Sequence, residues 1–170
     1  MSKSINIQQI TLIALMAALV LVLTRFLQVP IPATQGYVHL GDAGITFAAC
    51  AFGPWVAAVA GGLGTMLADL TSGYAEWAVF SLLVHGVQGW VMGWLLRREV
   101  DVVGVALAVC ASSVIVVGGY FVAGTMLMGM GKAASEIVPN LLQVLSGGVV
   151  GVPLYLAVRR AYPPVTRYRE

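Results

Sequence analysis

Polar side chains at helical spacing interrupt two apolar stretches of the sequence. Glu136, Asn140 and Gln143 stand at positions i, i+4 and i+7, so a helix would place them on one face. A second stripe of the same kind consists of Trp77, Ser81, His85 and Gln88. Amide, imidazole and carboxyl groups inside a membrane can bind a small polar molecule, or they can hydrogen-bond to one another between helices.

For a single residue of this kind, a hydrogen bond between helices is the more common role. Two stripes that run inward from one end, beside an aromatic residue, favour a binding pocket. The aromatic residue is Tyr120, whose ring could stack on a flat ligand or belong to the aromatic belt at the membrane surface. His85 follows Glu76 by about 13 Å of helix, so it could be the floor of the pocket or a structural contact.

Motifs of several functional classes are absent from the sequence. There is no GxxxxGK[ST] phosphate loop, so the chain cannot drive transport with ATP by itself, and no HExxH or GxSxG motif indicates an enzyme. The GxG within Gly61–Asp69 lacks the third glycine of a dinucleotide site, so we interpret it as helix packing. Asp69 is either a cap for the local backbone or a ligand-side residue, and we favour the structural role. Cys50 and Cys110 lie in apolar runs without a Cys/His cluster. We therefore expect no catalytic residue, cofactor, metal or disulfide.

The elements that carry these residues are apolar throughout. Of the 170 residues, 59% are hydrophobic and 9% are charged, whereas soluble proteins carry about 25% charged residues. This composition predicts an all-α protein that crosses the lipid bilayer, with residues 1–170 in one domain. Six segments could span: Ile7–Leu27, Ala43–Phe52, Val56–Leu70, Trp77–Leu96, Val102–Met128 and Ala134–Val158.

The second and third segments are short, and the turn signal Gly53-Pro54 separates them. Lys3 and the first apolar segment together resemble a signal peptide, but no small-residue cleavage site follows, so we expect a retained helix. Residues 28–42 contain two prolines and two glycines, which predicts an ordered non-helical connection. Connections of this length usually have a function, such as that of a lid.

The basic residues predict the orientation. With six spans, one side of the membrane holds seven of them: Lys3, Arg97, Arg98, Arg159, Arg160, Arg167 and Arg169. The other side holds Arg25 and Lys132. Because positive charge collects on the cytoplasmic side, both termini should be cytoplasmic in a cell membrane. The net charge is only +2, which gives no indication of nucleic-acid binding.

The sequence resembles the substrate-binding S components of energy-coupling factor (ECF) vitamin transporters over nearly its whole length. The first matching stretches are Gly41–Ala43, Phe52–Pro54, Gly61–Asp69 and His85–Gly89. The later ones are Gly118–Tyr120, Ala133–Glu136, and Pro139-Asn140 with Gln143. Ala14 and Ala18 match the AxxxA motif of the family's first helix. The pattern is most similar to the riboflavin and hydroxymethylpyrimidine branch.

The resemblance implies a six-helix monomer of a prokaryotic cell membrane that binds one vitamin-like molecule near its outer face. It implies one membrane coupling (T) subunit and two cytoplasmic ATPase subunits as partners, with the Ala14 and Ala18 face docking on the coupling subunit. The S component would topple in the membrane to release its ligand. Where this chain has His85, relatives often carry lysine. Histidine is mostly neutral at physiological pH and suits an uncharged heterocycle.

We therefore expect a small flat heterocycle, such as riboflavin, a thiamine precursor or pyridoxine, stacked by Tyr37, Trp77 or Tyr120. Its candidate polar contacts are His39, His85, Gln88, Glu136, Asn140 and Gln143. A stand-alone secondary transporter or channel is the main alternative, but coupling carboxylates and an inverted repeat are not evident. A membrane-embedded enzyme has no supporting motif. A purely structural subunit would leave the polar stripes unexplained.

Overall fold

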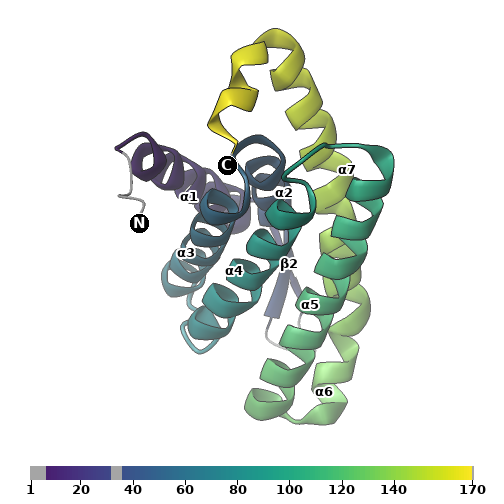
Figure 1. The fold of residues 1–170 in the computed structure, drawn as a ribbon. Helices are drawn as coiled ribbons and strands as arrows, with labels where there is room; N and C mark the ends of the chain where they lie inside the picture. The colour runs from purple at the N-terminus through teal and green to yellow at the C-terminus, as the bar shows by residue number, and fades with distance from the viewer. Residues whose placement is uncertain (1–6, 32–35, 170) are drawn as a thin grey trace, which may run out of the picture.

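The computed structural model describes residues 7–31 and 36–169, so the expectations for Lys3 and for residues 32–35 lie outside it. The fold is all-α apart from one hairpin, which confirms the predicted class (Figure 1). The helices are α1 (Ile7–Phe26), α2 (Gly41–Phe52), α3 (Pro54–Ser72), α4 (Ala78–Leu95), α5 (Val102–Met128), α6 (Met130–Ser135) and α7 (Ile137–Ala161). A 3₁₀ helix, η1 (Pro163–Tyr168), follows α7.

Helix boundaries follow local chemistry. Between α2 and α3, Gly53 has φ of 85° and Pro54 begins the next helix, as the turn signal predicted. The Asp101 side chain caps α5 by accepting a hydrogen bond from the Gly104 amide over 2.7 Å. The predicted segment Ala134–Val158 is instead divided at Glu136 into α6 and α7. Pro139 has no N–H with which to continue the hydrogen bonds of α6. The chain therefore starts a new helix at Ile137, with Pro139 in its first turn.

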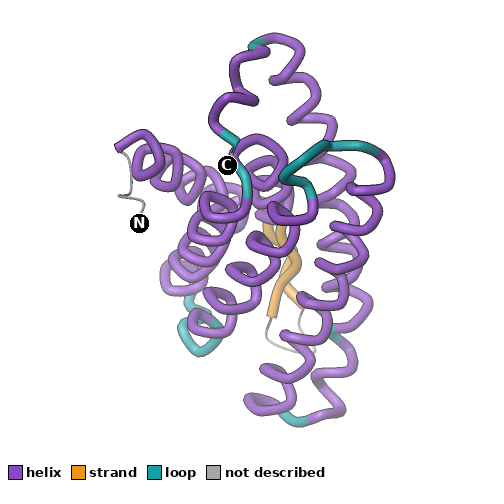
Figure 2. The backbone as a smooth tube through the Cα atoms, viewed as in Figure 1, coloured by secondary structure: helices purple, strands orange, loops and turns teal. Residues whose placement is uncertain are grey.

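The connection between α1 and α2 contains a short antiparallel hairpin, which the sequence did not predict. Strand β1 (Gln28–Ile31) pairs with β2 (Gly36–His39), and Val29 lies opposite Val38. Figure 2 shows the hairpin among the helices. Its backbone hydrogen bonds explain why a proline-rich connection can be ordered.

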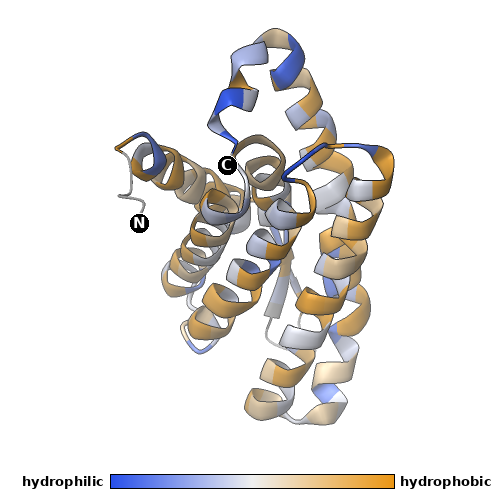
Figure 3. Cartoon of the chain, in the orientation of Figure 1, coloured by the Kyte–Doolittle hydropathy of each residue, from blue (hydrophilic) through white to orange (hydrophobic). Residues whose placement is uncertain are grey.

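Four described helical stretches are long and apolar enough to cross a membrane: α1, α4, α5 and the α6–α7 stretch from Met130 to Ala161. Hydrophobic residues predominate along these helices (Figure 3). Large apolar side chains are exposed on them, among them Val22, Val114 and Val149. By contrast, α2 has 12 residues and all of them are buried. It packs against α1, α3, α4 and α7. This central helix therefore joins the core to the candidate site.

Hydrophilic residues mark one end of the bundle, where the α4–α5 connection, the end of α7 and η1 lie (Figures 1 and 3). Arg97, Arg98, Arg159 and Arg169 line one hollow there. Lys132 lies in α6 at the opposite end (Figure 1). The arrangement is consistent with the predicted separation of basic residues.

Candidate functional site

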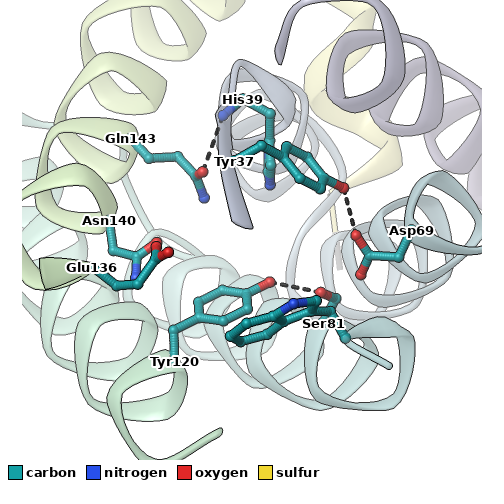
Figure 4. A pocket seen from close by; sticks show the side chains of 9 residues that line it. Tyr37, His39, Asp69, Ser81, Tyr120, Glu136, Asn140 and Gln143 are labelled. Carbon is teal, nitrogen blue, oxygen red and sulfur yellow. Dashed lines mark hydrogen bonds between the residues drawn. The ribbon is translucent and has the colours of Figure 1, made fainter. Parts of the chain in front are cut away.

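A pocket lies between the hairpin, α3, α4, α5 and α7 (Figure 4). Its lining residues are Tyr37, His39, Asp69, Trp77, Ser81, Tyr120, Glu136, Asn140 and Gln143. Seven of the nine side chains that the sequence nominated as ligand contacts are among them. The first stripe thus reaches the cavity with all three of its residues and the second with Trp77 and Ser81, and the hairpin that the long connection forms lies at the same cavity.

Aromatic rings form two sides of the pocket. Tyr37 and Tyr120 lie across it from one another in Figure 4. Trp77 packs beside Tyr120 with 5.9 Å between ring centroids, and the Tyr120 hydroxyl lies 2.7 Å from Ser81 Oγ. The Tyr37 hydroxyl donates a hydrogen bond to Asp69 Oδ1. These contacts hold the rings in place, so a flat ligand could enter between surfaces that are already oriented.

The Tyr37 hydroxyl stays protonated and acts as a hydrogen-bond donor. Burial raises the pKa of this phenol above its usual value, and the nearby Asp69 carboxylate raises the pKa further. The hydroxyl therefore keeps its proton and ties the hairpin to α3. Asp69 thus has a structural contact, and its carboxylate also lines the pocket.

His85 and Gln88 lie in a layer beside the pocket and not in its lining. Gln88 Nε2 donates to Asp42 Oδ2 over 2.9 Å, and Gln88 Oε1 lies 2.6 Å from His85 Nδ1. Since the Gln88 amide nitrogen faces Asp42, its oxygen is the acceptor and His85 Nδ1 carries a proton. The His85 ring centroid is 5.6 Å from that of Tyr120 and 5.4 Å from that of His39. This layer therefore contacts the pocket wall through both rings.

Asp42 connects this layer to the pocket, and the sequence analysis did not nominate it. Its Oδ1 accepts a hydrogen bond from Gln143 Nε2 over 3.2 Å, and Gln143 Oε1 accepts one from the His39 backbone amide over 3.1 Å. Asp42 is 0% exposed. The available signal was the carboxylate itself, because an aspartate within an apolar membrane segment is costly unless it is paired.

Close packing of α7 on α2 makes these bonds possible. A Cβ atom on Gly147 would lie 2.5 Å from Asp42 Cβ, which is far closer than van der Waals contact. Glycine at this position lets the two helices approach, so that Gln143, about one turn earlier, reaches the carboxylate. The glycine at position 147 therefore serves the site as well as the fold.

His39, Asp42 and His85 offer metal-ligand atoms that all lie within 4.8 Å of one another. Their lone pairs are largely occupied, however. His39 Nδ1 accepts a hydrogen bond from the Gly41 amide over 3.1 Å, and both Asp42 oxygens accept from glutamine amides. A cation would have to displace these bonds, so the geometry favours a hydrogen-bond network over a metal centre.

The buried His39 ring gives the site a testable pH dependence. Burial lowers the pKa of His39 well below its usual value, and the nearby His85 lowers the pKa further. Below about pH 6.5 the unfolded chain binds a proton at this residue that the folded chain does not. We expect the melting temperature in detergent to fall as the pH is lowered from 7 to 5. The His39→Asn variant, whose Oδ1 can still accept from Gly41, should show a weaker fall; an unchanged slope would contradict this role.

Comparisons with known proteins identify the family of the chain. The sequence profile of the family described as "ECF-type riboflavin transporter, S component" matches residues 4–160. The thiamine precursor transporter HmpT of Lactococcus lactis subsp. cremoris (strain MG1363) is 35% identical over 156 residues, which cover 91% of this chain and 90% of HmpT. A Pyrococcus woesei protein, described only as an uncharacterized protein in a gap 3' region, is 34% identical over 146 residues, covering 86% of this chain and 98% of that protein.

Proposed function

Because this chain belongs to the ECF-type riboflavin transporter S component family, we propose that the pocket of Figure 4 is the site at which it captures its ligand. The chain is a membrane-embedded binding subunit for uptake of a vitamin or vitamin precursor, and the family consists of transport proteins rather than enzymes. The observation that carries the proposal is that side chains from both polar stripes line one cavity together with the aromatic rings of Tyr37, Trp77 and Tyr120.

The ligand we propose is a thiamine precursor or a similar heterocycle with a single aromatic ring. The similarity to HmpT supports this class.

The pocket presents hydrogen-bond donors on one side and an acceptor on the other, and a ring of this kind can pair with both. On the α7 side, Asn140 Nδ2 is a buried donor without a partner among the described residues. His39 accepts at Nδ1 and so carries its ring proton on Nε2. On the α3 side, Asp69 Oδ2 is a buried acceptor without a described partner. A pyrimidine with ring nitrogens on one edge and an amino or hydroxymethyl group on another would satisfy both sides.

We further propose that α2 and α3, together with the four long stretches, complete a bundle of six membrane segments in one domain. At 1.5 Å per residue, α2 is about 18 Å long, so it relies on the hairpin to reach the outer surface. The end that holds the arginine-lined hollow would face the cytoplasm of a prokaryotic cell, with both termini on that side.

As an S component, the chain acts with an ECF module. We propose that this module comprises a membrane coupling (T) subunit and two cytoplasmic ATPase subunits. The contact would be the face of α1 that carries Ala14 and Ala18, both of which are exposed. Small side chains allow another helix to approach closely in the bilayer.

The ligand site is tested by identifying what binds. Protein purified from cells should carry a small heterocycle that mass spectrometry can identify. The Asn140→Ala variant should bind that ligand about 10- to 100-fold more weakly, because one buried hydrogen bond is lost. The matched control is Ser135→Ala, whose exposed hydroxyl bonds only to the Lys132 carbonyl. If no small molecule binds and Asn140→Ala supports normal uptake, the pocket is misassigned; uptake without an ECF module would instead indicate a stand-alone transporter.

A further inference from the structure

A second hollow lies at the arginine-rich end of the bundle and shares no lining residue with the ligand pocket. It is bounded by the α4–α5 connection, the last turns of α7 and η1. Its lining includes four arginines and two acidic residues: Arg97, Arg98, Arg159, Arg169, Glu99 and Asp101. Four positive and two negative charges leave a local charge of +2.

Among the described residues, no carboxylate forms an ion pair with the arginines of this hollow. Between described residues, no Asp or Glu oxygen lies within 4.0 Å of their guanidinium nitrogens. Asp101 is engaged elsewhere, because it caps α5 at Gly104. Arg97 stacks on Trp94, with 4.8 Å from its Cζ to the ring centroid. The hollow therefore holds unpaired positive charge.

One of the arginines is held in place by the core. Arg169 donates to the Cys50 carbonyl at the end of α2, and its Nη2 donates to the Tyr155 hydroxyl over 2.8 Å. Tyr155 is 0% exposed and lines the hollow. Since its oxygen accepts from Arg169, its own proton remains available to a bound acceptor. The hollow thus combines the exposed Arg97, Arg98 and Arg159 with a fixed cation and an oriented hydroxyl.

We propose that this hollow binds a phosphate group at the membrane surface, as carried by an anionic lipid headgroup or by free phosphate. Guanidinium forks match phosphate oxygens with two parallel hydrogen bonds. Basic pockets between membrane helices are suited to phospholipid headgroups. Leu154 and Leu156 are exposed on α7 on either side of Tyr155, so lipid acyl chains could lie against the same helix. The alternative explanation is that these arginines only set the orientation of the protein in the membrane. Orientation depends on the number of basic residues on each side and does not require four guanidinium groups around one hollow.

Lipid binding to the purified protein in detergent tests the proposal. Phosphatidylglycerol should bind in native mass spectrometry and raise the melting temperature, whereas phosphatidylcholine should do so far less. The double variant Arg98→Gln/Arg159→Gln should weaken the phosphatidylglycerol affinity by about tenfold or more. The control Arg25→Gln/Lys132→Gln removes the same charge outside the hollow and should bind like the unmodified protein.

The two sources of phosphate are separated by adding inorganic phosphate at constant ionic strength. A shift with phosphate alone, lost in the arginine double variant, identifies free phosphate; a shift with phosphatidylglycerol alone identifies the lipid. Equal binding of phosphatidylcholine, or an unchanged affinity in the double variant, would overturn the proposal. If the double variant does not fold, Arg159→Lys keeps the charge but loses the fork and should still weaken binding. The affinity for the vitamin-like ligand, measured on the same samples, tests the pocket of Figure 4 separately from the arginine-lined hollow.

Discussion

Replacing Asp42 with alanine should lower the ligand affinity by on the order of 100-fold and substantially destabilise the protein. The carboxylate accepts hydrogen bonds from two buried side-chain amides, those of Gln88 and Gln143. Each buried donor left without a partner costs about 1–3 kcal/mol. The free energy of unfolding should therefore fall by about 2–6 kcal/mol.

The loss of affinity follows from the direction of the hydrogen bonds. Asp42 can only accept, so it turns both glutamine nitrogens toward itself and both oxygens away. The Gln143 oxygen is then available to the His39 amide, which holds the hairpin against α7 at the pocket. Without the carboxylate, the side-chain amide of Gln143 can rotate and exchange the positions of its oxygen and nitrogen. The pocket wall then presents a donor where the ligand meets an acceptor in the unmodified protein, or the reverse.

The Asp42→Asn variant separates this orienting role from simple packing. Asparagine has nearly the same shape but offers one donor and one acceptor, so one of the two glutamines must reverse. We expect an affinity between those of the unmodified protein and Asp42→Ala, measured by calorimetry together with melting in detergent. The control is Glu99→Gln, which removes an exposed carboxylate away from the pocket. Full affinity in Asp42→Asn would show that the network does not orient the site.

Tryptophan at Ala14 or Ala18 should reduce ECF-dependent uptake to background while ligand affinity changes by no more than about twofold. Both alanines are exposed, whereas α1 packs on the rest of the bundle through Met16, Ala17, Val20 and Thr24. An indole on the exposed face leaves the core intact but holds a docking helix away. Close approach of membrane helices depends on small residues at the contact.

The measurement pairs uptake into cells that contain the ECF module with ligand binding to the purified variants. Val114→Trp on α5 is the matched control, because Val114 is 74% exposed and lies on another helix. It should transport normally. If both alanine variants transport like the unmodified protein, the coupling subunit docks elsewhere; if they lose ligand binding as well, α1 supports the pocket directly.

The candidate site was only partly predictable, and Gln88 and Asp42 illustrate why. Helical spacing brought Trp77, Ser81, His85 and Gln88 onto one face, but spacing alone does not say how deep a residue lies. The Gln88 side chain turns away from the pocket because its partner is Asp42, 46 residues earlier. The bond from Gln143 to Asp42 joins residues 101 positions apart. Such pairings depend on which helices pack together, and no local pattern carries that information.

The sequence by itself determined the helices, the apolar surface and the two polar stripes. Its information is local: a bilayer requires apolar segments with internally satisfied backbones, and Gly53 and Pro54 end one helix and begin another. Only the tertiary structure decided that the connection folds into a hairpin beside the pocket and that α2 is buried at the centre. The physical reason is that buried polar groups must be satisfied. Asp42 obtains its donors from α4 and α7, and that requirement fixed which side chains face the cavity and which support it.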